Sequence, residues 1–161
     1  MRLFGIANRR QQREADCLVA AIATVLDYLA VPVQYEQLRK LLGTTASGTP
    51  FSRVSRLLRW RLWVERGHGT LQIVQEYLEF GLPLLAAVRT DALPYWMDRT
   101  DVALEEKATD HVVVIVGLED ETVYLNDPDF AEAPQLVDRE SFLLAWSGRD
   151  EEYAVIGLTE P

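Results

Sequence analysis

Hydrophobic positions in the first 80 residues follow helical periodicity. A nearly continuous apolar stretch runs from Cys17 to Ala30 and begins directly after Asp16, a residue type favoured at helix N-caps. Apolar residues recur at helical spacing in three further segments, namely residues 35–42, a segment after Pro50, and residues 70–80. The first half of the chain is therefore predicted to be helical.

The second half carries short apolar runs that are rich in β-branched residues and typical of strands. These runs lie at residues 83–88, 111–117, 122–125 and 153–158, with one short helical pattern at residues 139–146. Helices followed by strands predict an α+β fold, in which an N-terminal helical lobe packs on a C-terminal antiparallel β-sheet lobe. The length suits a single domain over residues 1–161.

Residues 90–109 form a polar segment without clear periodicity, directly before the strand pattern that starts at His111. A segment of this length is more often functional or mobile than passive. Two interpretations are equally open: the segment overhangs a cleft, or it is a surface loop packed by Tyr95 and Trp96.

Charge is divided unevenly along this acidic chain, whose formal net charge is −9. Residues 1–66 carry eleven Arg and Lys against five Asp and Glu, whereas residues 67–161 carry five against twenty. We expect the two halves to attract each other across their junction. No nucleic-acid partner is expected, because nucleic-acid-binding domains are usually basic.

No segment predicts secretion or a membrane span. The N-terminus lacks the apolar region of a signal peptide, and the stretch at residues 17–30 is shorter than the ~20 residues of a membrane helix. A single cysteine excludes an internal disulfide and fits a reducing compartment, so a cytoplasmic location is expected. One cysteine and two histidines predict neither a zinc site nor another cofactor, and the oligomeric state is not indicated.

Cys17, the only cysteine, stands at the predicted start of an apolar helix. The N–H groups and dipole of a first helical turn favour an anion and so favour the nucleophilic thiolate. The neighbouring charge of Asp16 opposes this effect, so the thiolate of Cys17 still requires a cationic neighbour.

Three further residues complete the set that thiol acyl transfer requires. His111 is the candidate base and acid, Asp127 the candidate group that orients the imidazole, and Gln11 a candidate oxyanion donor beside the Cys17 N–H. If a hairpin turn is centred on Glu119, His111 and Asp127 face each other directly across two strands, within hydrogen-bonding reach. Asn126 then points to the opposite face and is the weaker candidate.

Each of these residues also has a purely structural interpretation. A lone cysteine is more often a small buried apolar residue than a nucleophile, and Asn-Asp-Pro at residues 126–128 is a common turn initiator. The arginines at positions 53, 56 and 59 are interpreted as a solvated helix face, and His68 as a loop residue. The joint occurrence of the four candidates favours the functional interpretation.

These motifs resemble the papain-like cysteine peptidases of the C39 family, which includes domains that cut bacteriocin leader peptides after a double glycine. The resemblance is carried by Gln11-x4-Asp16-Cys17 before an apolar helix, by His111-Val-Val-Val-Ile-Val-Gly, and by Tyr124-Leu-Asn-Asp127-Pro. It implies a papain-like fold with Cys17 as nucleophile, His111 as base, Asp127 as orienter and Gln11 as oxyanion donor. One departure is Leu18, where the family commonly has glycine.

The combined prediction is a cysteine peptidase that acts on a peptide or protein substrate. Two alternatives stay open: a catalytically silent peptide-binding module on the same scaffold, and a related amidase or transglutaminase-like acyl-transfer enzyme.

Overall fold

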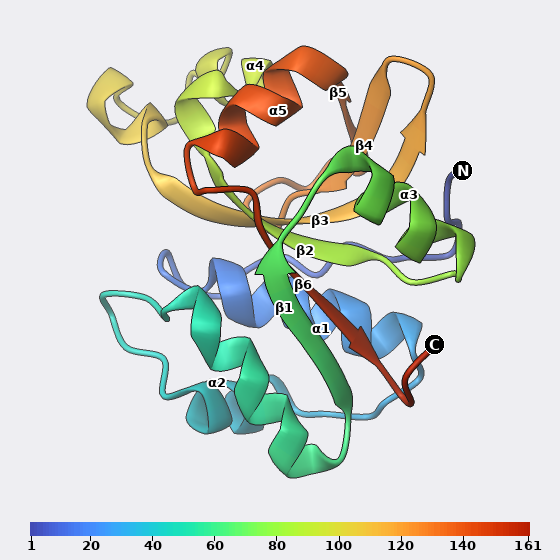
Figure 1. Cartoon of the computed structure of the whole chain (residues 1–161). Helices are drawn as coiled ribbons and strands as arrows, with labels where there is room; N and C mark the ends of the chain where they lie inside the picture. The colour runs from blue at the N-terminus through green and yellow to red at the C-terminus, as the bar shows by residue number, and fades with distance from the viewer.

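A six-stranded antiparallel sheet with helices on both faces forms the protein (Figure 1). The computed structural model describes all residues 1–161. The strand order is β1-β6-β2-β3-β4-β5. The strands are β1 (Trp63–His68), β2 (Leu84–Arg89), β3 (Asp110–Glu119), β4 (Thr122–Asn126), β5 (Gln135–Asp138) and β6 (Glu152–Gly157). This architecture confirms the predicted α+β class.

One face of the sheet is covered by α1 (Cys17–Tyr28), α2 (Tyr35–Leu42) and the 3₁₀ helix η1 (Phe51–Trp60), which lie below the sheet in Figure 1. Nine consecutive residues of α1, Leu18–Leu26, are buried. A helix that is apolar all round is stable only when it is enclosed, so α1 forms the centre of this layer.

The opposite face is covered by α3 (Leu71–Glu79), α4 (Pro94–Met97) and α5 (Arg139–Ser147), with the 3₁₀ turns η2 (Thr90–Ala92) and η3 (Leu104–Lys107). Successive side chains of β3 alternate between the two cores, because strand residues point to opposite faces in turn. Val112 and Val114 pack toward α1, and Val113 and Ile115 pack toward α5. The helical pattern at 70–80 therefore belongs to the second layer rather than to an N-terminal helical lobe.

Two strands that the hydrophobic pattern did not predict, β1 and β5, lie at the two edges of the sheet. Both carry partly exposed side chains and lack the continuous apolar runs of the central strands. An edge strand pairs on one side only and is less enclosed, so its sequence pattern is weaker. His68 is the last residue of β1 rather than a loop residue.

The basic first half is joined to the acidic second half mainly by apolar packing. Among the ion pairs, Arg66–Glu152 at 3.9 Å is the one that links residues 1–66 with residues 67–161. Arg53 and Arg56 are also more than a solvated face, because their guanidinium groups donate to the carbonyl oxygens of Leu42 (2.8 Å) and Leu41 (3.1 Å). They satisfy carbonyls that the C-terminus of α2 leaves unpaired.

Candidate active site

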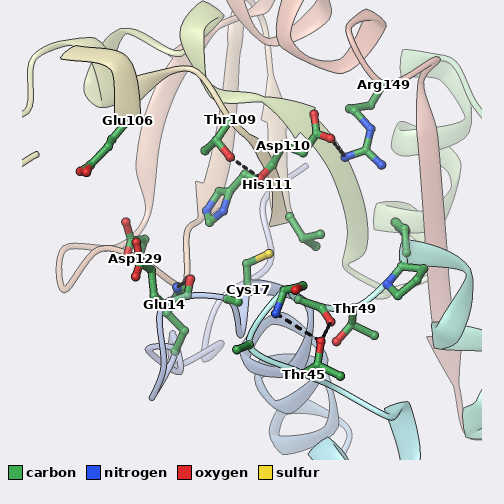
Figure 2. A pocket seen from close by; sticks show the side chains of 18 of the residues that line it. Glu14, Cys17, Thr45, Thr49, Glu106, Thr109, Asp110, His111, Asp129 and Arg149 are labelled. Carbon is green, nitrogen blue, oxygen red and sulfur yellow. Dashed lines mark hydrogen bonds and ion pairs between the residues drawn. The ribbon is translucent and has the colours of Figure 1, made fainter. Parts of the chain in front are cut away.

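Cys17 is the first residue of α1 and lines an open cleft of about 1050 Å³ at the end of the sheet. Its side chain is partly exposed, so it is not one of the sealed core residues. Figure 2 shows the sulfur in the cleft, below the ring of His111, which comes from β3. Leu18, by contrast, is buried in the α1 core and does not line the cleft, so it does not obstruct the thiol.

His111 and Asp127 form a buried hydrogen-bonded pair, with 2.7 Å between His111 Nε2 and Asp127 Oδ1. His111 is 5% exposed and Asp127 0%. The bond at Nε2 leaves Nδ1 as the ring nitrogen available to Cys17. The thiol from one layer and the imidazole–carboxylate pair from the other thus meet at the end of β3.

The predicted register of the hairpin is wrong, although the predicted contact is present. The turn lies at Asp120–Glu121, beyond Glu119, and Gly117 is opposite Tyr124. If that register continued unbroken, Asn126 rather than Asp127 would share a face with His111.

A β-bulge between Ile115 and Gly117 corrects this arrangement. It shifts the pairing by one residue, so that Val114 is opposite Asn126 and Asp127 returns to the face of His111. The contact is therefore diagonal rather than direct, and diagonal neighbours remain within reach of longer side chains. Asn126 instead donates to the carbonyl oxygen of Ile6 on the other face (3.2 Å).

Asp127 accepts three further hydrogen bonds, all from residues that the sequence did not assign to the site. Tyr95 Oη (2.8 Å) and Trp96 Nε1 (2.9 Å) donate to its Oδ2, and the Asp129 N–H (2.9 Å) donates to its Oδ1. Trp96 also meets the His111 ring edge to face, at 5.0 Å between centroids. The signal for Tyr95 and Trp96 was the Leu-Pro-Tyr-Trp cluster within an otherwise polar segment.

The segment at residues 90–109 is anchored as well as exposed. Its two ends are joined by Thr90, which hydrogen-bonds the main chain of Lys107 and Thr109, and Arg99 stacks on Trp96 at 4.5 Å. Beyond α4 the segment forms one wall of the cleft through Val102, Glu105, Glu106, Ala108 and Thr109. Both interpretations offered from the sequence therefore hold in part.

Electrostatics favour an imidazolium–carboxylate pair. Burial alone disfavours the charged ring, but the adjacent Asp127 carboxylate, assisted by Cys17, outweighs burial and raises the pKa of His111 above its ordinary value. Burial likewise opposes the charge of Asp127. The imidazolium, the Asp129 N–H and the Trp96 indole outweigh that penalty and lower the pKa of Asp127.

Gln11 lines the same cleft, but its amide is engaged in the loop before α1. Its Nε2 donates to the carbonyl oxygens of Glu14 (2.6 Å) and Arg13 (3.2 Å), and its Oε1 is buried without a partner. The structure thus brings Gln11 to the site with both amide hydrogens already used.

Asp16 is the N-cap residue of α1, but its side chain makes no capping hydrogen bond. Its carboxylate is fully buried and accepts bonds from Tyr35 Oη (2.9 Å) and from Arg39 Nε (3.1 Å). The charge of Asp16 is therefore compensated by Arg39 of α2, a partner that the sequence did not indicate.

The opposite wall of the cleft is the loop between α2 and η1, which contributes residues from Gly43 to Phe51. The thiol and the imidazole lie between this loop and the wall from residues 102–110 (Figure 2). A second hollow of about 640 Å³, beside η1, contains no histidine or cysteine. The candidate chemistry is confined to the first cleft.

The fold, together with a half-buried thiol at a helix start opposite a histidine–carboxylate pair, is that of a cysteine-type peptidase. The chain belongs to the Peptidase_C39 like family, whose model matches residues 5–153. It is 27% identical over 143 residues to the lactococcin-A transport/processing ATP-binding protein LcnC of Lactococcus lactis subsp. lactis. That match covers 86% of this chain but 17% of LcnC, so the chain spans about a sixth of that relative.

Solved structures show the same fold. A putative C39-like peptidase from Bacillus anthracis has a TM-score of 0.75 at 16% identity and covers 99% of this chain and 98% of its own. The peptidase domain of Streptococcus ComA, a bifunctional ABC transporter, has a TM-score of 0.70 at 17% identity, with 96% and 99% covered. A double glycine motif protease from an AMS/PCAT transporter, solved with its leader peptide, has a TM-score of 0.64 at 18% identity, with 98% of each chain covered.

None of the helices in the structure has the length and apolar character needed to cross a bilayer.

Proposed function

We propose that this chain hydrolyses peptide bonds through a Cys17–His111–Asp127 triad, with Gln11 in the oxyanion hole. The observation that carries the proposal is the 2.7 Å bond from His111 Nε2 to Asp127, made where the ring faces the sole thiol across the cleft. That bond fixes the ring orientation and stabilises its charged form.

In the acylation step, the thiolate sulfur of Cys17 attacks the carbonyl carbon of the scissile peptide bond. A carbon–sulfur bond forms, and the carbonyl electron pair moves to oxygen. When the oxyanion collapses, the carbon–nitrogen bond breaks and His111 gives its Nδ1 proton to the departing amine. The product is a thioester on Cys17 and a neutral imidazole.

In the deacylation step, His111 removes a proton from water as the water oxygen attacks the thioester carbon. The carbon–sulfur bond then breaks, releasing a carboxylic acid and returning the thiolate–imidazolium pair. Asp127 keeps the ring in place in both steps, and Tyr95 and Trp96 keep Asp127 in place by donating to its other oxygen.

The oxyanion is stabilised by the Cys17 N–H, which as the first amide of α1 has no partner within the helix. The second donor in this proposal is the Gln11 amide. Because both its hydrogens are bonded to loop carbonyls, Gln11 must exchange one of them, at Arg13 or Glu14, for the substrate oxygen. Gln11→Ala is expected to lower kcat by about 10²-fold with little change in folding stability.

The proposed substrate is an extended peptide or protein segment that lies between the two cleft walls. LcnC is a transport and processing protein, and the AMS/PCAT relative is a double glycine motif protease, so peptides with a Gly-Gly bond site belong in the test panel. A cytoplasmic location is proposed on the basis of the single, unpaired cysteine.

The test is hydrolysis of a peptide panel by the wild type and by Cys17→Ala and Cys17→Ser, with acyl-enzyme trapped and identified by mass spectrometry. We expect a thioester on Cys17 and loss of turnover in both variants. Unchanged turnover in Cys17→Ala would end the proposal. Peptide binding without any turnover would favour the binding module, and a trapped acyl group from a side-chain amide would favour the amidase or transglutaminase-like alternative.

A further inference from the structure

A buried cluster of Asp16, Tyr35 and Arg39 lies directly behind the candidate nucleophile. The Asp16 carboxylate is 0% exposed, although the residue immediately precedes Cys17. Arg39 Nε lies 3.2 Å from its Oδ1 and 3.1 Å from its Oδ2, and Tyr35 Oη donates to Oδ2 at 2.9 Å. No other acidic or basic residue lies in the first turn of α1.

The charge of Asp16 has a direct consequence for the thiol. An unpaired carboxylate at the start of α1 would oppose an anion on the next residue and would cancel part of the favourable effect of the helix N-terminus. Arg39 supplies the opposite charge in a partly buried setting, where its side chain is 16% exposed and solvent screens the interaction less than at the surface.

Tyr35 extends the cluster to the loop that carries Gln11. Its hydroxyl donates to Asp16 and accepts the Gln12 N–H at 3.2 Å. Burial raises the pKa of Tyr35 to about 12, so the hydroxyl keeps its proton and its role as donor near neutral pH. The start of α1 and the loop before it are thus fixed to the same hydroxyl of α2.

We propose that Asp16, Tyr35 and Arg39 are positioning residues for the nucleophile. In this proposal Arg39 cancels the charge of Asp16, so that the carboxylate does not repel the Cys17 thiolate. This inference rests on the proposed function, because it assigns a role in preparing the thiol that the triad uses. The carboxylate then serves as an anchor between α1 and α2 without acting on the sulfur as a net charge.

The experiment measures the iodoacetamide alkylation rate of the full chain as a function of pH. Because Cys17 is the only cysteine, the reaction reports on this thiol alone. Relative to wild type, Arg39→Gln should move the midpoint of the pH profile upward by about one unit, because Asp16 is left unpaired. Asp16→Asn should move it downward, because Arg39 is left uncompensated, and the double variant should return close to the wild-type midpoint.

Two controls separate this electrostatic role from a general loss of structure. Arg13→Gln removes a nearby arginine that pairs with Glu36 at the surface, at 3.2 Å, and should leave the midpoint unchanged. Arg39→Lys keeps the charge and should remain near the wild-type midpoint. If Arg39→Gln does not fold, the downward shift in Asp16→Asn decides the matter.

Equal midpoints in wild type, Arg39→Gln and Asp16→Asn would overturn the inference. That result is distinguishable from failure of the proposed function, which is decided by turnover in Cys17→Ala and does not depend on alkylation.

Discussion

Two buried carboxylates flank the candidate nucleophile and base, and they differ in the partner that compensates their charge. Asp16 at the start of α1 and Asp127 after β4 are both 0% exposed. Asp16 is paired with Arg39, which stays charged at any pH of interest, whereas Asp127 is paired with His111, which titrates. Each carboxylate also accepts a tyrosine hydroxyl, from Tyr35 and Tyr95 respectively.

The same buried group thus serves two purposes according to its partner. Beside a permanent cation, a carboxylate contributes an anchor whose charge is cancelled under all working conditions. Beside an imidazole, it raises the pKa of the ring and so sets the pH range in which the ring is charged.

The largest effect is expected on removing the titratable partner. His111→Gln should lower kcat/KM by about 10³-fold or more, because neither the thiolate nor the leaving amine then has its proton-transfer partner. The matched control is His68→Gln, which alters the only other histidine, at the exposed end of β1. Equal activity losses in the two variants would contradict the assignment of roles.

Removing the permanent cation, Arg39, should lower the stability of the fold in addition to its effect on the Cys17 thiol. Arg39→Gln leaves the fully buried Asp16 uncompensated and should lower the free energy of unfolding by about 3 kcal/mol. Asp16→Asn leaves a guanidinium that still reaches solvent and lies 4.0 Å from Glu36, so the loss should be about 1 kcal/mol. Urea denaturation measures both values, and a larger loss in Asp16→Asn would reverse this ranking.

Neutralising the Asp127 carboxylate should shift the pH profile of activity. The pKa of His111 is raised above its ordinary value of about 6.5, so in wild type the imidazolium persists above that pH and the alkaline fall in kcat/KM is delayed. Asp127→Asn should move this fall to lower pH by one to three units and reduce the maximum by about 10²-fold. An unmoved alkaline limb would show that Asp127 does not stabilise the charged ring.

The same pair links stability to pH in two opposite directions. The raised pKa of His111 gives stabilisation that is complete below about pH 6.5 and is lost as pH rises through the folded-state value. The lowered pKa of Asp127 gives stabilisation that is present above about pH 4 and is lost in acid. The urea concentration at the unfolding midpoint should therefore fall in wild type both in acid and at alkaline pH. In His111→Gln the alkaline fall should be less steep.

The smallest effect is expected at the second oxygen of Asp127. Tyr95→Phe should lower the free energy of unfolding by about 1 kcal/mol and kcat by a few-fold, because Oδ2 loses one donor but keeps Trp96. Tyr153→Phe is the control, since it removes a similar tyrosine–carboxylate bond, to Glu65 at 2.9 Å, away from the cleft. It should reduce stability without changing kcat.

Much of the fold could be predicted from hydrophobic periodicity. The parts that could not be predicted were missed for physical reasons. The helix at Cys17 and the central strand at His111 are strongly apolar, so both were predicted close to their observed bounds. The edge strands β1 and β5 were missed because pairing on one side does not require a continuous apolar run. The helix at 70–80 was predicted, but its layer was not, because β1 carries the chain to the other face of the sheet.

The candidate site, too, was predicted only in part: its residues were indicated by the sequence, but the geometry of their contact was not. The sequence indicated His111 and Asp127 through their positions at a strand start and after a hairpin strand. Their contact depends on a β-bulge between Ile115 and Gly117, which no local sequence pattern predicted. Without that one-residue shift, Asn126 would occupy the face of His111.

Apolar spacing and the scarcity of Cys and His are properties of the chain alone, so they were enough to predict the α+β plan, the family and the residue types available for thiol chemistry. Which partners those residues meet depended on the tertiary structure. It brought Arg39 to Asp16 and Trp96 to Asp127, because charge compensation and hydrogen bonding of buried groups depend on elements far apart in the chain.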